Sequence, residues 1–268
     1  MNISTTKKEL QSAFSKLTKT TQVKSQNPLA SYTYISSGAH GVTLHSTDLE
    51  VGIKTQITAS VNTNGEGLFP TSEVNDIISV IDEGRVDIDI AGPHINIKSE
   101  KGISFDIPTE PFQEYPEIPE NKHESLFTIE TVKLKNIINS LLYAINAEPT
   151  KPALNGAFFN FDQGSVDFVA TDGHRLVKIT RQNDTNIQQG FIIPKKYLVI
   201  LNTFLDKQKE TSLIFSEDYV FSNNGKDVFY SKIIDEKFPN YNAVIPDSNP
   251  EELNAQKTEM LSNIKAAS

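Results

Sequence analysis

The chain has 268 residues, of which 37% are hydrophobic, and a formal net charge of -9. This length and content favour a globular protein of one or two domains. The acidic balance gives no sign of a nucleic-acid partner, so any phosphate contact needs a local basic surface. The absence of cysteine excludes disulfides, thiolate nucleophiles and sulfur-ligated zinc.

The N-terminal segment has no features of an export signal. The stretch "MNISTTKKEL" contains no apolar core, and no window approaches the roughly 18 apolar residues that a membrane helix needs. We therefore expect a cytoplasmic protein that has no membrane partner.

In chain order, the first predicted elements are two amphipathic helices separated by strands. The helix over 7–17 buries residues at helical spacing, namely Leu10, Ala13, Phe14 and Leu17. The helix over 70–81 does the same with Val74, Ile77 and Ile81. Over 86–99 apolar and polar residues alternate with period two, which predicts strands with one buried face.

The same pattern then begins again. Helices are predicted over 132–142 and 194–205, and their apolar residues lie 124 positions after those of the first pair: Leu134, Ile137, Ile138, Leu141, Leu198, Leu201 and Leu205. Thr47 and Asp48 recur as Thr171 and Asp172 at that interval, and Phe112 recurs as Phe238 after 126 residues. The chain is therefore predicted to repeat an α+β domain in which two helices pack on antiparallel sheet.

Polar, proline-containing segments at 119–125 and 246–252 are the predicted linkers. They divide the chain into domains over 1–121 and 122–248. From Leu253 a third unit begins, since Leu253, Met260 and Ile264 match Phe127, Leu134 and Ile138 at an interval of 126. A complete third unit would bring the whole chain to about 375 residues. We expect 249–268 to be a linker and the first helix of an incomplete domain.

Several motifs, taken together and in order, resemble one known family. They are "STDLE", "LNGAFF", "VATDGHRL", "IIPKKYLVIL" and "KIIDEKFPNYNAVIP". They resemble the bacterial DNA polymerase III beta subunit, the beta sliding clamp, over essentially the whole chain. The resemblance implies the DNA clamp (processivity-factor) fold, a homodimer ring of three-domain chains around duplex DNA, no enzymatic activity and no cofactor. The resemblance leads us to expect that this chain lacks most of the third domain and does not close the usual ring.

The resemblance also implies a peptide-binding pocket on the second domain. Its partners in the family are the alpha subunit of DNA polymerase III, the clamp loader and other proteins with a clamp-binding motif. The matching positions here are Leu154, Thr171, Gly173, His174, Arg175, Leu176, Pro239 and Val244. From spacing alone, Leu154, Leu176 and Val244 are better explained as ordinary core residues. The family's third domain supplies the rest of the pocket, so we expect weakened peptide binding.

Contacts with DNA are expected from the helices and from two loops. On the helices the candidates are Lys8, Lys19, Lys133 and Lys135, with Lys7 and Lys16 beside the first pair and Lys195 and Lys196 on the last helix. The resemblance adds Lys24 and Lys151 in the loops, although Pro152 and Ala153 replace the family's aromatic residues. Such binding is sequence-independent and salt-sensitive. Each lysine alone is better explained by solvation of a helix.

The resemblance further places Phe105 and Ile107, which share one face of a strand, at the dimer interface. Two alternatives keep the fold: a two-domain clamp that closes as a trimer, and a peptide-binding module without a DNA function. A third is a hydrolase, because Asp172 and His174 on an extended strand would point to the same side. The default for "TDGHRL" is a turn or cap with Gly173 at positive φ. The other histidines, His40, His45, His94 and His123, have no metal-ligand spacing.

Overall fold

The computed structural model describes residues 1–21, 27–38, 41–119, 125–146, 151–205, 209–246, 248 and 250–267. Lys24, His40 and His123 lie outside these residues. The chain divides into two compact units, Met1–Phe238 and Pro239–Ser268. Each unit is described by itself.

The first unit contains both predicted repeats. The elements of the first repeat are β1 (Asn2–Thr6), α1 (Lys7–Leu17), η1 (Pro28–Ser31), β2 (Tyr32–Gly38), β3 (Gly41–Thr47), β4 (Val51–Ile57), β5 (Ser60–Thr63), β6 (Gly65–Pro70), α2 (Thr71–Val80), β7 (Arg85–Ala91), β8 (His94–Ser99) and β9 (Ser104–Pro108). Those of the second are β10 (Ser125–Glu130), α3 (Thr131–Leu142), η2 (Pro152–Leu154), β11 (Gly156–Asp162), β12 (Ser165–Thr171), β13 (Leu176–Gln182), β14 (Gly190–Pro194), α4 (Lys195–Phe204), β15 (Glu210–Phe215), β16 (Tyr219–Asn224) and β17 (Asp227–Lys232).

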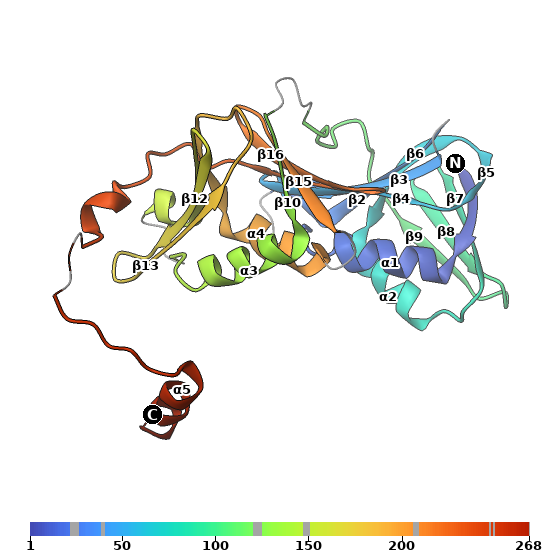
Figure 1. Ribbon diagram of the computed structural model, residues 1–268. Helices are drawn as coiled ribbons and strands as arrows, with labels where there is room; N and C mark the ends of the chain where they lie inside the picture. The colour runs from blue at the N-terminus through green and yellow to red at the C-terminus, as the bar shows by residue number, and fades with distance from the viewer. Residues whose placement is uncertain are drawn as a thin grey trace. The chain divides into compact units, whose positions relative to one another are not determined.

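Antiparallel sheets connect the two repeats. The strand orders are β5-β1-β7-β8-β9, β13-β12-β11-β14 and an eight-stranded sheet, β10-β15-β16-β17-β4-β3-β2-β6. The eight-stranded sheet passes from one repeat to the other where β17 pairs with β4, from Asp227 opposite Thr55 to Ser231 opposite Val51. Helices α1 to α4 all lie on one side of this sheet (Figure 1). The predicted α+β fold is confirmed.

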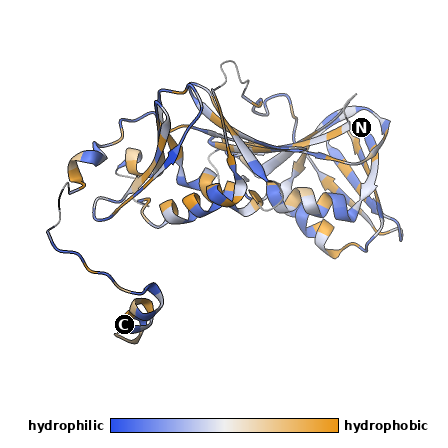
Figure 2. Ribbon diagram, viewed as in Figure 1, coloured by the Kyte–Doolittle hydropathy of each residue, from blue (hydrophilic) through white to orange (hydrophobic). Residues whose placement is uncertain are grey.

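The helices form where the sequence predicted them because their apolar stripes face the core. Every apolar residue named for the four helices is buried, from Leu10 and Phe14 in α1 to Leu201 and Leu205 in and after α4, and the ribbons alternate in hydropathy (Figure 2). Burial of a side chain such as Phe14 stabilises the fold by about 2 kcal/mol. The Thr6 hydroxyl, directly before α1, accepts a hydrogen bond from the Glu9 amide at 3.3 Å and so caps the N-terminus of the helix.

The second unit contains η4 (Tyr241–Val244) and α5 (Lys257–Ala267). The predicted helix after Leu253 is thus present from Lys257 onward. Its apolar residues are exposed, with Met260 at 45% and Ile264 at 55%. Because none of its apolar residues is buried, α5 gains little stability from packing within its own unit.

Candidate functional site

The β12–β13 turn positions four of the predicted pocket residues. The Thr171 hydroxyl donates to the Arg175 carbonyl at 2.7 Å and accepts from the Gly173 amide at 3.1 Å. One oxygen of Asp172 accepts from the amides of His174 and Arg175, both at 3.0 Å. Gly173 has φ +91, a left-handed conformation that glycine adopts without strain. The predicted turn with positive φ is confirmed.

The first repeat builds the same turn between β3 and β4. The Thr47 hydroxyl donates to the Val51 carbonyl at 3.0 Å, and Asp48 accepts from the amides of Glu50 and Val51 at 3.0 and 2.8 Å. The shared threonine and aspartate therefore satisfy backbone donors and belong to the fold. The hypothesis that Asp172 lies on an extended strand was wrong, because this capping bends the chain there.

Arg175 is held in place by two groups. Its Nε donates to the second oxygen of Asp172 at 2.7 Å, and its guanidinium carbon lies 4.2 Å from the centroid of the Tyr143 ring. The hydrogen bond from Arg175, with two turn amides, lowers the pKa of Asp172, and the same bond raises the pKa of Arg175. Tyr143 is 67% exposed and was missed from the sequence. An aromatic residue directly after a helix was the available sign.

The remaining predicted pocket residues differ in their surroundings. Leu154, in η2, is buried at 6% exposure, whereas Leu176 at the start of β13 is half-buried. Lys151, expected to contact DNA, has its Nζ 4.0 Å from the position of a Cβ on Gly173, so it lies beside the turn. Pro239 and Val244 belong to the second unit, where both are exposed. The structure thus brings the turn and Lys151 together.

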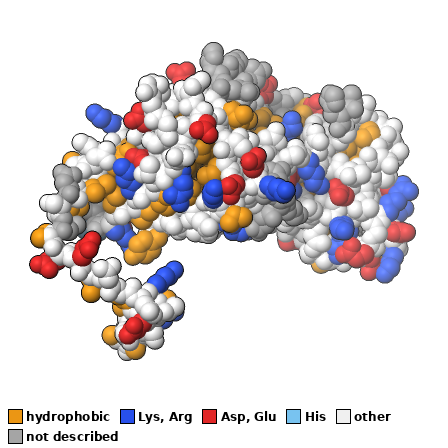
Figure 3. Space-filling model, in the orientation of Figure 1, with side chains coloured by type: hydrophobic (Ala, Val, Ile, Leu, Met, Phe, Trp, Pro, Cys, Tyr) orange, Lys and Arg blue, Asp and Glu red, His pale blue; other side chains and the backbone are white. Residues whose placement is uncertain are grey.

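The predicted DNA-facing lysines fall into two groups. Lys8, Lys19 and Lys133 are exposed, and Lys133 pairs with Glu130 at 2.6 Å. Lys135 is half-buried. Figure 3 shows basic and acidic side chains mixed over the visible face of the first unit, without one continuous basic patch.

A cavity of about 830 Å³ lies beside the helices where the repeats meet. Basic residues from both repeats line it, namely Lys19, Lys195, Lys196 and Lys232, together with Glu50. Lys195 donates to the Ile145 carbonyl at 3.3 Å. The cavity therefore combines local positive charge with an apolar wall that includes Val199 and Ile200.

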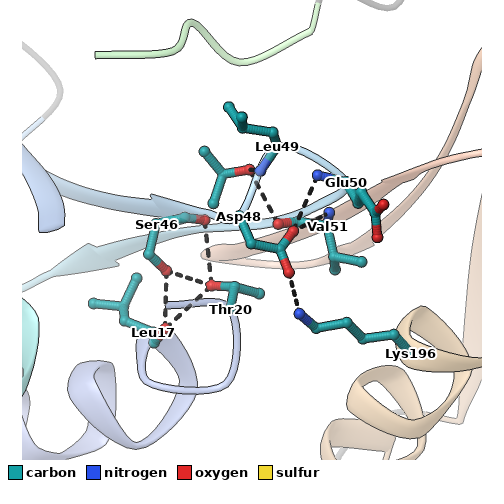
Figure 4. A network of polar contacts seen from close by, with 9 residues as sticks. Leu17, Thr20, Ser46, Asp48, Leu49, Glu50, Val51 and Lys196 are labelled. Atoms are coloured by element: carbon teal, nitrogen blue, oxygen red, sulfur yellow. Dashed lines mark hydrogen bonds and ion pairs between the residues drawn. The ribbon is translucent and has the colours of Figure 1, made fainter. Parts of the chain in front are cut away.

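Two of the predicted basic residues hold the repeats together. Lys16 pairs with Asp227 at 2.6 Å, and the Thr55 hydroxyl donates to the other oxygen of Asp227 at 2.5 Å. Lys196 pairs with Asp48, whose other oxygen caps its own turn (Figure 4). Both lysines therefore form ion pairs from one repeat to the other. Helical periodicity alone had suggested that Lys16 faces solvent.

Aromatic side chains also cross this joint. His45 Nε2 lies 2.7 Å from the Tyr230 hydroxyl, and the Tyr230 ring covers Gly52, where a Cβ would lie 2.0 Å from its nearest ring atom. Burial, with a smaller effect of Lys54, lowers the pKa of His45 to about 3. His45 is therefore neutral and structural at physiological pH.

Phe105 and Ile107 lie on β9, the edge strand of the five-stranded sheet. Both side chains are half-buried against the core. The edge leaves the outer backbone groups of β9 without a strand partner among the described residues. This placement gives β9 the geometry to add a further strand.

Two properties of the described residues bear on other functions. No group of three or more His, Cys, Asp or Glu side chains is arranged to hold a metal ion in the described parts of the chain. Among the helices that the structure describes, none is long and apolar enough to cross a membrane.

The fold defines the class of protein: tandem domains, each with two helices packed on antiparallel sheets, joined edge to edge into one longer sheet. The chain belongs to the DNA polymerase III beta subunit family, whose N-terminal domain matches residues 1–119 and whose central domain matches residues 128–240.

Individual relatives agree with this family. The beta sliding clamp of Treponema pallidum is 27% identical over 230 residues, covering 85% of this chain and 62% of the relative. The clamp of Pseudomonas aeruginosa is 27% identical, covering 76% of this chain and 57% of the relative. The chain thus spans less than two thirds of either. The crystal structure of the Bacillus subtilis clamp is similar with TM-score 0.94 and 22% identity, covering 100% of this chain and 73% of that one.

Proposed function

We propose that this chain is the first two domains of a DNA sliding clamp, a non-enzymatic processivity factor of the cytoplasm. In the complete ring it encircles duplex DNA and carries the replicative polymerase. The observation that supports this most strongly is the eight-stranded sheet that runs through both repeats with all four helices on one side. Such an arrangement presents helices to one surface, where lysine side chains can meet phosphates without reading sequence.

The DNA-contacting residues that we propose are Lys8, Lys19, Lys133, Lys135 and Lys151, together with Lys24 outside the described residues. Fluorescence anisotropy with labelled duplex DNA tests this at low and high salt. We expect weak binding that is lost as salt rises, and a further loss in the variant Lys8→Glu with Lys19→Glu. The matched control is Lys98→Glu with Lys101→Glu, since both lysines are exposed and neither lies on a helix. Equal losses in both double variants would contradict a helix-borne DNA surface.

The peptide-binding pocket that we propose comprises Leu154, Thr171, Gly173, His174, Arg175, Leu176, Pro239 and Val244. A P. aeruginosa sliding clamp, 23% identical, with TM-score 0.86 and covering 93% of this chain and 69% of that one, was solved bound to griselimycin. This supports a ligand-binding surface on a protein of this fold. The partners would be the alpha subunit of DNA polymerase III, the clamp loader and other proteins with the clamp-binding motif.

Isothermal titration with a clamp-binding-motif peptide tests this pocket. We expect Arg175→Ala to weaken binding about tenfold, because a positioned donor at the pocket rim is removed. Arg181→Ala, at an exposed position on β13, should leave binding unchanged. Unaltered binding by the Arg175 variant would place the peptide elsewhere.

We also propose domains over 1–121 and 122–248, with 249–268 beginning a third. Phe105 and Ile107 would face the partner chain of the ring, as a half-buried apolar pair on an edge strand can do. Because the chain spans part of its relatives' length, these assignments apply to the complete assembly.

A further inference from the structure

A second pocket opens in the first repeat, apart from the β12–β13 turn. Its volume is about 350 Å³, and its walls include Tyr34, His45, Glu66, Phe112, Tyr115 and Glu117. The Tyr34 ring stacks on Tyr115 at 5.7 Å between centroids and lies 6.3 Å from Phe112. The pocket thus has aromatic walls and two carboxylates.

The polar groups of this pocket are negative or neutral. Glu66 and Glu117 are exposed. The Tyr115 hydroxyl donates to backbone carbonyls of Tyr32 and His45, at 3.0 and 3.2 Å. His45 also lines the pocket, and its Nε2 is hydrogen-bonded to the Tyr230 hydroxyl. Lys54 faces His45 across the β3–β4 pair but does not line the pocket.

The second repeat shows that the fold does not require this pocket. The β2–β6 ladder of the first repeat corresponds to the β11–β14 ladder of the second. Tyr34 opposite Leu68 corresponds to Phe158 opposite Ile192, and Ser36 opposite Glu66 corresponds to Asn160 opposite Gly190. Tyr34 is therefore equivalent to Phe158, and Glu66 to Gly190. In the second repeat Phe158 stacks on Phe238 at 4.8 Å and 8°. A Cβ on Gly190 would lie 2.3 Å from the Phe158 ring. Packed apolar rings therefore fill the space that is open, and lined by carboxylates, in the first repeat.

We propose that this aromatic pocket binds an arginine side chain of a partner peptide. A cation is attracted to aromatic ring faces, and the planar guanidinium both stacks on a ring and donates paired hydrogen bonds to a carboxylate. Tyr34 and Phe112 supply rings, while Glu66 and Glu117, which also line the pocket, supply acceptors. A lysine ammonium could pair with one carboxylate but has no planar face to stack. The pocket is thus a second peptide-binding site, on the first repeat.

The test compares two small ligands of the same shape on the full 268-residue chain. N-acetyl-arginine amide carries the guanidinium, and N-acetyl-citrulline amide replaces it with a neutral urea. In ¹⁵N NMR titrations we expect shifts at Tyr34, Glu66 and residues 112–118 with the arginine ligand, and at least about tenfold weaker binding of citrulline. Equal binding of citrulline, or of N-acetyl-lysine amide, would overturn the proposal.

Variants connect the binding to this pocket. Glu66→Gln with Glu117→Gln keeps the shape and removes both charges, and should weaken arginine binding at least about tenfold. Glu114→Gln lies on the same segment, is exposed and does not line the pocket, so it should bind as the parent does. Because all these positions are exposed, circular dichroism should show each variant folded. Arginine binding that survives the double substitution would refute the assignment.

Discussion

The joint between the repeats depends on an ion pair that is nearly closed to water. The side chains of Lys16 and Asp227 are 12% and 10% exposed, and their charged atoms lie 2.6 Å apart. Asp227→Ala leaves the Lys16 ammonium without its counterion and the Thr55 hydroxyl without its acceptor. Removing one partner of a buried pair costs about 3 to 5 kcal/mol. At about 2 to 4 °C per kcal/mol for a chain of this size, the unfolding midpoint should fall by roughly 10 °C.

Thermal unfolding followed by circular dichroism checks this value, and a double-mutant cycle checks the reason. The cycle consists of Lys16→Met, Asp227→Leu and the double variant. The double variant should recover the part of the loss that comes from an unpaired buried charge, because an apolar pair needs no desolvation of charge. The control is Lys101→Ala, which breaks an exposed pair with Asp82 at 2.9 Å and should cost less than about 1 kcal/mol. The reasoning is refuted if the double variant loses as much as the two single variants summed.

Three other positions give sharp tests. Gly52→Ala forces a methyl into the tyrosine ring that covers it and should cost about 1 to 3 kcal/mol in urea unfolding, whereas Gly38→Ala, with no atom within 4 Å, should be neutral. Burial lowers the pKa of His45 to about 3, so only the unfolded state gains its proton below about pH 6.5. The contribution of His45 to stability should therefore fall by about 1.6 kcal/mol in total from pH 6.5 to 5, and His45→Gln should remove this part of the pH dependence. Since Arg175 lowers the pKa of Asp172, the carboxyl NMR titration of Asp172 should move to higher pH in Arg175→Gln.

Local periodicity was enough to predict the helices. The apolar residues of α1 recur every three or four positions from Leu10 to Leu17, and the helix spans 7–17 as expected. The interval of 124 between Leu10 and Leu134 predicted the second copy for the same reason. The helices depend on residues close in sequence and the repeat on a comparison of the sequence with itself, so neither needed tertiary information.

The joint could not be predicted in this way. Lys16 lies on the polar side of α1, but nothing in its neighbourhood indicates Asp227, which is 211 residues away in sequence. The pairing of β17 with β4 could not be predicted either, because the alternating pattern of each strand is compatible with several partners and registers. The β12–β13 turn, in contrast, was predicted as the default from Asp172 and Gly173, and only the alternative with Asp172 on an extended strand was wrong. Tyr143 was missed because a residue after a helix has no fixed periodic position.

The β17–β4 ladder has a mechanical consequence. A flexible linker between domains permits bending at little cost. The β17–β4 ladder has five residue pairs, so several backbone hydrogen bonds must break together before the sheet can bend there. We therefore expect backbone ¹⁵N relaxation to show no independent motion of β17 relative to β4. Bending between the repeats would have to take place outside these five residue pairs.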